Sequence, residues 1–491
     1  MTELDKSAPA ADPHHEKRWL VLGVIGIAQL LVVLDATIVN IALPSAQADL
    51  GFSDASRQWV ITSYALAFGS LLLLGGKLAD LFGRKRAFLV GLIGFAAASA
   101  LGGAAPSFGV LIVARVLQGM SGALLAPAAL SLLATTFTDP QERGKAFGIF
   151  GAIAGGGGAV GLLLGGVLTE LLDWRWCLYV GLVFAVPAAF FGARLLHPPV
   201  PRDRPRLDLP GTALATSGLF ALVYGFARAE TDGWSDGLTV ALLVAAVVLL
   251  ATFVQVERRV AQPLLPMRIV LDRNRGGAYL AVVIAGTGIF GIFIFLTFYL
   301  QQTLGFSPIE TGVAFMPMNL AIVFTAVTVN TKVLARTGPR PLVPTGMALN
   351  VVSLLLLSQI EVDSSYALHV LPSLVLTGVG FGLIFAPSFA GATAGVAPQD
   401  SGVASAMVNT SQQVGGAVGT ALLSTVVASA ITGYLADNPG VDPGVATVHG
   451  YTVAFLAAAG IFAVGAVLCG ALLRSGVPAA PAHGAEPAVA H

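Results

Sequence analysis

Long apolar stretches alternate with short polar connections along almost the whole chain. A helix needs about 20 apolar residues to cross the hydrocarbon core of a bilayer, and stretches of that kind number roughly fourteen. They lie at residues 19–43, 57–76, 87–105, 108–137, 144–171, 175–196, 209–229, 237–256, 276–301, 309–333, 341–360, 366–392, 402–433 and 450–473. The pattern predicts an all-α, multi-pass membrane protein.

Composition narrows the class further. Apolar residues make up 56% of the chain and charged residues 11%, whereas a soluble domain usually carries about 25% charged residues. The formal net charge is zero, so we expect no nucleic-acid partner. Cys177 and Cys469 are the two cysteines; the predicted topology puts them near opposite membrane faces, so no disulfide framework is expected.

The basic residues lie mainly in every second connection. If the N-terminal tail is inside, the outer connections hold only Arg57, Arg175 and Arg228 among the Lys and Arg residues. The outer connections are instead acidic, as in AETDGWSDG (Ala229–Gly237). Because Lys and Arg accumulate on the cytoplasmic side, we expect a cell-membrane protein with both termini in the cytoplasm.

An internal sequence repeat relates the first group of predicted spans to the last group. The segment DPQERGKAFGIFGAIAGGGGAVG (Asp139–Gly161) aligns with APQDSGVASAMVNTSQQVGGAVG (Ala397–Gly419) through PQ, a following Gly and the final GGAVG. Spans two to five therefore correspond to spans ten to thirteen, running in the same direction. Parallel repeats of this kind are a transporter design, with the substrate site between the halves near the midplane.

The repeat predicts the domain organisation. Two six-helix bundles are joined by a linker that contains two additional transmembrane helices. The expected boundaries are 1–18 for a cytoplasmic tail, 19–196 for the N-terminal bundle, 197–273 for the linker, 274–474 for the C-terminal bundle and 475–491 for a second cytoplasmic tail.

Two ionisable residues lie deep inside predicted spans. Asp35 lies about eight residues before the outer end of span one and Arg115 about seven residues after the outer start of span four, so each is about 11 Å below the outer surface. The similar depth makes a direct or water-mediated pair feasible. A fixed ion pair that only sets helix packing is one interpretation. The other is a proton site, since intramembrane ionisable residues usually mark ion pathways.

Several motifs resemble one known family. LDATIVNIALP (Leu34–Pro44) resembles the first-helix signature of fourteen-span drug:proton antiporters in the major facilitator superfamily, and GKLADLFGRKR (Gly76–Arg86) resembles that superfamily's loop motif. RVLQGMSGA (Arg115–Ala123) resembles its fourth-span motif, and GGAVGLLLGG (Gly157–Gly166) its span-five antiporter motif. The resemblance covers residues 19–474 and implies the major facilitator fold.

The resemblance also implies roles for individual residues. Arg115 would take part in proton transfer with Asp35, and the loop motif would form a gate latch against the other half. The loop residues are Gly76, Asp80, Gly83, Arg84 and Lys85, and the glycines of the antiporter motif are Gly157, Gly161, Gly165 and Gly166.

Physical arguments accompany the motifs. Glycines at a spacing of four give span five a smooth face for another helix, so plain packing is as good an explanation as antiport. Asp80 could dock on the positive N-terminal end of span thirteen. The sequence departs from the family pattern at Leu162, where Pro is usual, and at Gly181, where Asn is common. These departures weaken an argument from a proline kink and remove a polar contact.

Aromatic, Met and amide side chains near the middle of the spans are candidates for a substrate cavity. Such a wall would suit a bulky amphiphile, although each residue could equally serve helix packing. The candidates are Asn40, Tyr64, Gln118, Phe293, Tyr299, Met316, Asn319, Asn409 and Gln413.

The function expected from these features is export of a hydrophobic or amphiphilic drug-like compound in exchange for protons, by a monomer that uses no cofactor beyond protons. Uptake of a small nutrient by the same fold is one alternative, but it would favour more charges in the cavity. A membrane receptor or enzyme is another, but the chain has no HExxH metal motif and no nucleophile elbow.

The second half offers no obvious acid to balance a doubly charged substrate. Phe290, which is apolar, lies near the repeat position of Asp35, and Glu310 lies near an outer helix end, too shallow to serve. We therefore expect neutral or singly charged substrates.

Overall fold

The computed structural model describes residues 17–52, 59–196, 208–329, 333–397 and 400–474. Within these ranges the regular secondary structure is entirely helical, with no strand. Thirteen helices are long and apolar enough to cross a membrane, and a bent pair, Gln141–Ala154 and Gly156–Leu171, makes a fourteenth span. The described part of the chain thus confirms the predicted class, an all-α multi-pass membrane protein.

We group the helices by the boundaries expected from the sequence, into a first bundle, a linker and a second bundle. The first bundle contains α1 (Arg18–Leu50), α3 (Trp59–Phe82), α4 (Arg84–Gly103), α5 (Phe108–Thr136), α6 (Pro140–Leu171) and α7 (Trp176–Leu195). The linker contains α8 (Leu209–Thr231), α9 (Gly237–Glu257) and the short α10 (Met267–Val270). The second bundle contains α11 (Arg273–Phe298), η2 (Tyr299–Thr303), α12 (Pro308–Ala314), α13 (Met316–Val329), α14 (Ala335–Thr337), α15 (Pro339–Leu357), η4 (Tyr366–Val370), α16 (Leu371–Thr393), α17 (Ser401–Asp437) and α18 (Pro443–Leu472).

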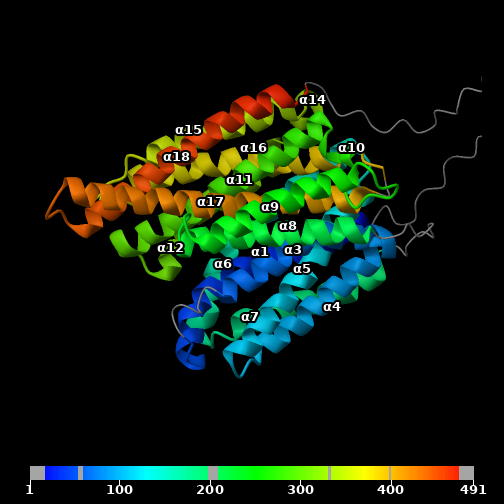
Figure 1. The fold of residues 1–491 in the computed structure, drawn as a ribbon, viewed down its shortest axis with the longest axis horizontal. Helices are drawn as coiled ribbons and strands as arrows, with labels where there is room; N and C mark the ends of the chain where they lie inside the picture. Colours follow the sequence, from blue (N-terminus) through cyan, green and yellow to red (C-terminus); the bar gives the residue numbers. More distant parts are fainter. Residues whose placement is uncertain (1–16, 53–58, 197–207, 330–332, 398–399, 475–491) are drawn as a thin grey trace, which may run out of the picture.

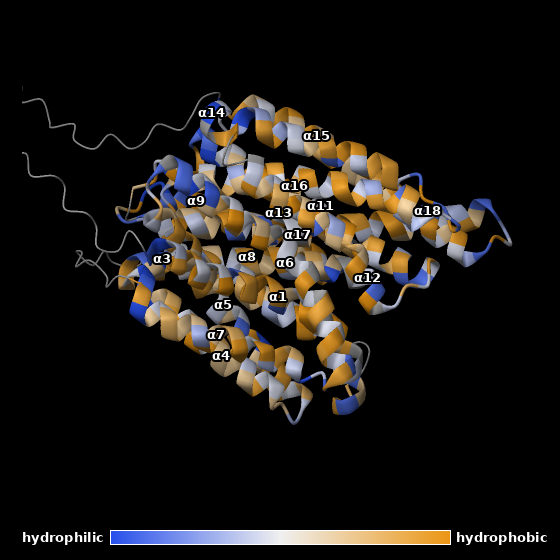
Figure 2. Cartoon of the chain, turned by 180° about the vertical axis from the view of Figure 1, so that it is seen from behind, coloured by the Kyte–Doolittle hydropathy of each residue, from blue (hydrophilic) through white to orange (hydrophobic). Residues whose placement is uncertain are grey.

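The two bundles lie side by side with the hairpin α8–α9 along their junction (Figure 1). Helix α8 of the hairpin packs on α3 of the first bundle and on α17 of the second, and α9 packs on α8. In Figure 2, hydrophilic residues gather at the two ends of the bundles and hydrophobic residues cover the length between them. That distribution is the one expected of helices that cross a bilayer.

Equivalent helices pack in the same way in the two halves. α1 packs on α6 as α11 packs on α17, and α3 packs on α5 as α13 packs on α16. Glycine permits the second approach in both halves, because an added Cβ would lie 2.5 Å from the Tyr64 carbonyl oxygen at Gly119 and 2.2 Å from the Met318 carbonyl oxygen at Gly378. The packing therefore repeats along with the sequence.

Aspartates begin several of the helices. Asp139, Asp208, Asp236, Asp272 and Asp442 each accept a hydrogen bond from a backbone N–H in the first turn of the helix that follows. A carboxylate at this position satisfies free N–H groups and complements the helix dipole. This local chemistry explains why so many acids lie at span ends and why an acid deep in a span stands out.

Candidate functional site

Asp35 and Arg115 meet in the interior of the first bundle. Asp35 comes from α1 and Arg115 from α5, and their side chains are almost completely buried. Nη1 of Arg115 donates a hydrogen bond to Oδ2 of Asp35 over 2.7 Å. The pairing that similar depth made feasible is thus a direct contact, between two helices that are well separated in sequence.

Gln118 forms hydrogen bonds with both residues of the ion pair. It lies one helical turn after Arg115, so both side chains leave the same face of α5. Its Oε1 accepts from Arg115 Nη1 over 2.8 Å, and its Nε2 donates to Asp35 Oδ1 over 3.0 Å. Gln118 is one of the substrate-cavity candidates named from the sequence, with helix packing as its alternative; in the structure it is fully buried at the ion pair. The spacing of three from Arg115 was the signal for this position.

Arg115 also contacts α3. Nε donates to the backbone oxygen of Val60 over 3.0 Å, and the guanidinium carbon lies 4.5 Å from the centre of the Tyr64 ring. Tyr64 is itself buried and stacks on Phe68. The cation is therefore held by α3 as well as by α1, so a movement between these helices would change the environment of Asp35.

Ser99, which gave no signal in the sequence, lies behind Gln118 and against Gly181. Nε2 of Gln118 donates a further hydrogen bond to Oγ of Ser99 on α4 over 2.9 Å. A Cβ at Gly181 of α7 would lie 2.4 Å from that same oxygen. Glycine at this position lets α7 approach the serine that orients Gln118, whereas the asparagine common in similar sequences would collide with it here.

The glycine face of α6 packs on α1, the helix that carries Asp35. A Cβ at Gly157 would lie 3.0 Å from the Val33 side chain, and one at Gly161 would lie 2.0 Å from Thr37 Oγ1. Gly165 faces Ile38 in the same way, and Gly166 faces Ile309 of α12 at 3.6 Å. The smooth face is thus occupied by the neighbouring helix. The Leu162 side chain lies outside the described residues.

Asp80 joins the two bundles at the end where α1 begins. Its carboxylate accepts hydrogen bonds from the backbone N–H of Gly402, at 3.0 and 3.1 Å, and of Val403, at 3.2 Å. These are free N–H groups in the first turn of α17. Asp400 lies at the N-cap of α17 but does not cap it with its own side chain, so the acid that stabilises this helix end comes from the other bundle.

The other loop-motif residues shape this junction. A Cβ at Gly76 would lie 2.6 Å from the Gly402 carbonyl oxygen, so α3 and α17 touch backbone to backbone. Gly83 has φ +92°, a conformation that favours glycine. Arg84 lies 3.9 Å from the Asp80 carboxylate, and Lys85 donates to the backbone oxygens of Ala193 and Leu196.

Further contacts close the same end of the molecule. Oγ of Ser131 on α5 lies 2.7 Å from Oγ of Ser401 on α17. Arg143 of α6 donates to Oγ1 of Thr393 on α16 over 3.2 Å. The two bundles therefore share polar contacts here, and the structure corresponds to a conformation closed at this end.

The remaining cavity candidates occupy different settings. The ring of Phe293, which is half-buried, lies 4.9 Å from that of Phe315. Met316 is exposed and Gln413 is half-buried. The Asn40 side chain lies outside the described residues.

Two amides and a tyrosine are occupied by backbone partners. Nδ2 of Asn319 donates to the Phe315 oxygen, and Nδ2 of Asn409 donates to the Ser405 oxygen. Tyr299 is completely buried, and its hydroxyl donates to the Glu361 oxygen over 2.7 Å. In this conformation Tyr299 therefore serves helix packing and presents no surface to an open space.

The chain is similar to known membrane transporters in sequence. The family model described as Major Facilitator Superfamily matches residues 25–420. The chain is 54% identical over 478 residues to the puromycin resistance protein pur8 of Streptomyces alboniger, covering 95% of this chain and 94% of that one. It is 41% identical to the cephamycin export protein CmcT of Amycolatopsis lactamdurans, covering 83% and 84%.

A solved structure agrees at the level of the fold. The human organic anion transporter MFSD10 (TETRAN) superimposes with a TM-score of 0.64 at 17% identity, covering 92% of this chain and 99% of that one. This likeness concerns the arrangement of helices alone.

Proposed function

The chain belongs to the major facilitator superfamily, and from this premise we propose that it exports an amphiphilic antibiotic from the cytoplasm in exchange for protons. Its relatives are named for resistance to puromycin and export of cephamycin. Among the described residues, Asp35 is the acid buried deep within a span that faces a buried arginine. This pair is the observation that carries the proposed coupling.

The ion pair supplies a way to bind and release a proton. A carboxylate in an apolar site needs either a cation or a proton to remain neutral overall. In the conformation described, Arg115 and Gln118 satisfy Asp35, so no proton is required. If α1 moves relative to α3 and α5, Asp35 loses these partners and takes up a proton instead. Conformational change and proton exchange are then linked.

The contacts of Asp80 with Gly402 and Val403 of α17, which we call the gate, provide a means of alternating access. We infer from the positive-inside pattern that the end closed by Asp80 is cytoplasmic and that both termini lie there. With this end closed, the site between the bundles 19–196 and 274–474 would open outward and release substrate. Breaking the contacts of Asp80 with α17 would open the cytoplasmic end. The hairpin α8–α9 of the linker 197–273 bridges both bundles during this change.

The driving force is sufficient for resistance. One elementary charge that moves through 100 mV contributes about 2.3 kcal/mol. Exchange of one proton for a neutral compound would therefore sustain a concentration ratio of roughly fiftyfold. We propose that the transporter acts as a monomer with protons as coupling ions and no other cofactor.

A resistance profile tests the proposal. The gene would be expressed in an antibiotic-susceptible host that lacks its main efflux pumps, with puromycin, a cephamycin, lincomycin and tetracenomycin C as probes. We expect a raised inhibitory concentration for at least one probe, and its loss in Asp35→Asn at equal membrane abundance. No protection against any probe, or full protection by Asp35→Asn, would contradict the proposal.

The gate contact yields a separate prediction. Asp80→Asn removes the negative charge at the N-terminus of α17, where such a charge contributes about 0.3–1 kcal/mol and up to ~2 kcal/mol when partly buried. We expect transport to fall by roughly three- to tenfold, by the same factor for every compound. Arg86→Gln, which changes an exposed side chain of the same loop, is the matched control. A loss confined to one compound would indicate that Asp80 contacts substrate.

Substrate charge yields another prediction. A dication in an apolar cavity needs compensating acids, and Asp35 also has to bind the proton. Phe290 is apolar, and Glu310 belongs to the capping box that begins α12, where its carboxylate accepts from Ser307 N. We expect a monovalent dye to be exported at least tenfold faster than a divalent analogue of similar size. Equal or faster export of the divalent dye would contradict this expectation.

A further inference from the structure

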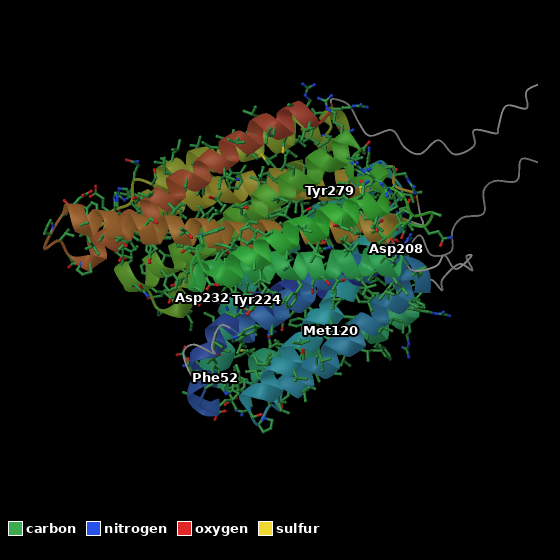
Figure 3. The ribbon with its side chains drawn as sticks, in the orientation of Figure 1. Phe52, Met120, Asp208, Tyr224, Asp232 and Tyr279 are labelled. Carbon is green, nitrogen blue, oxygen red and sulfur yellow. The ribbon has the colours of Figure 1, made fainter. Side chains whose placement is uncertain are left out.

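Two acidic side chains are buried at the base of the α8–α9 hairpin, away from Asp35. Asp208 precedes α8 and is 6% exposed, and Glu257 ends α9 and is 3% exposed. Because α8 and α9 pack antiparallel as neighbours, the start of one meets the end of the other. Figure 3 labels Asp208 at the end of the molecule where α8 begins.

The two carboxyl groups face each other. A Cβ at Gly211 would lie 2.3 Å from both Oδ2 of Asp208 and Oε1 of Glu257, so these oxygens are at most about 4.6 Å apart. The other oxygen of each group is occupied: Oδ1 of Asp208 accepts from Gly211 N and Oε2 of Glu257 accepts from Leu265 N, each over 2.9 Å. Oδ2 and Oε1 accept from no donor among the described residues.

Among the residues that the structure describes, the surrounding charges leave the pair one positive charge short. Lys77 of α3 acts electrostatically on Glu257, and its ammonium donates to the Pro263 oxygen over 3.0 Å. Arg258 and Arg259 follow Glu257 but are exposed to solvent. Lys77 balances one carboxylate, and two buried carboxylates at this distance do not both stay ionised without a second counter-charge.

The other described elements packed nearby do not supply that charge. Asp80, further along α3, lies 3.9 Å from Arg84 at the start of α4, and Asp80 is bound to α17. Asp400, just before α17, pairs with Arg268 of α10 over 2.5 Å. The first eight turns of α17 contain no titratable residue before Tyr434.

We propose that Asp208 and Glu257 bind one proton between them and form a second proton site, at the gate end of the molecule. The proton bridges Oδ2 and Oε1 as a carboxylic acid that donates to a carboxylate, a strong charge-assisted hydrogen bond. Two carboxylates, one proton and Lys77 then sum to zero charge. When the proton leaves to water, the cluster keeps a net charge of −1 and the two carboxylates repel.

The location gives this proton a mechanical effect. Leu73 of α3, Phe253 of α9, Leu264 of the following connection and Val403 of α17 belong to one buried apolar cluster. Val403 is also a donor to Asp80 at the gate. The bound proton therefore holds the base of the hairpin together beside the gate. Its loss loosens the packing that keeps this end closed.

Infrared spectroscopy tests the proton directly. The purified protein would carry Asp35→Asn, so that the acid of the first site is absent. We expect the carbonyl stretch of a protonated carboxylic acid to persist at least two pH units above the ordinary carboxyl pKa of about 4, and to lose the intensity of one carboxylic acid in both Glu257→Gln and Asp208→Asn. A spectrum that Glu257→Gln and Asp208→Asn leave unchanged would overturn the proposal, and this readout does not depend on transport.

Cross-linking tests the effect on the gate. Ser131→Cys with Ser401→Cys places two thiols where the hydroxyl oxygens lie 2.7 Å apart. We expect disulfide yield to fall with rising pH relative to the same pair carrying Glu257→Gln, which keeps the shape without needing the proton. Comparison at each pH cancels the pH dependence of thiol oxidation. Equal yields in both backgrounds across the range would show that the pair does not act on the gate.

Discussion

Asp35→Asn is expected to abolish proton-driven export while leaving the protein in the membrane. Asparagine keeps the shape of the side chain and an oxygen that accepts from Arg115, but it does not bind a proton at neutral pH. Arg115 retains its bonds to Gln118 and to the Val60 oxygen. In inverted vesicles with an imposed pH gradient of about 1.7 units, which is equivalent to about 100 mV, we expect the accumulation ratio to fall from roughly fiftyfold to no accumulation.

The control for this variant measures transport without a proton gradient. Exchange of labelled for unlabelled compound across the membrane requires only alternating access, so Asp35→Asn should retain it. Asp49→Asn is a matched substitution on the same helix, since Asp49 lies near the C-terminal end of α1 and contacts Arg175 over 2.6 Å. Asp49→Asn should keep pH-driven accumulation. Near-normal accumulation by Asp35→Asn would remove this carboxylate from coupling.

Arg115→Ala is expected to have a similarly large effect for a different reason. Without the guanidinium, Asp35 loses the cation that stabilises its ionised form inside the bundle. The carboxyl then stays neutral by retaining its proton, so the protein inserts but does not release the proton in any conformation. We expect pH-driven accumulation to fall by at least tenfold from about fiftyfold, and transport to become insensitive to the pH gradient.

Arg115→Lys distinguishes charge from geometry. Lysine keeps the positive charge but does not reproduce the planar set of donors that reaches Val60, Asp35 and Gln118 together. We expect it to retain a pH-dependent but slower transport, between the wild type and Arg115→Ala. Wild-type pH dependence in Arg115→Ala would show that the arginine serves packing alone.

The fold followed from the sequence because membrane helices satisfy their own backbone and need only length and apolarity. The depth of Asp35 and Arg115 then predicted that they could meet, since two spans fix the height of each residue. The docking of Asp80 followed from the helix dipole at the start of α17. These features depend on position along a helix axis, which sequence specifies.

Other features depend on rotation about the helix axis and on side-chain reach, which the sequence did not specify. Gln118 was assigned to the cavity because its amide is polar and central, although its spacing from Arg115 placed it on the same face. Ser99 gave no signal, because a serine in a span usually bonds to its own helix. Asp208 and Glu257 looked like ordinary acids at span ends until the hairpin brought them together.

Proton movement driven by substrate is the most direct test of the central claim. The purified protein would be reconstituted in liposomes that contain a pH-sensitive dye, and a gradient of the compound that gives the strongest protection in the resistance panel would be imposed without any pH difference. The account predicts a dye response opposite in direction to substrate flow in the wild type and none in Asp35→Asn. Substrate flux without proton movement in the wild type, or equal proton movement in Asp35→Asn, would contradict it.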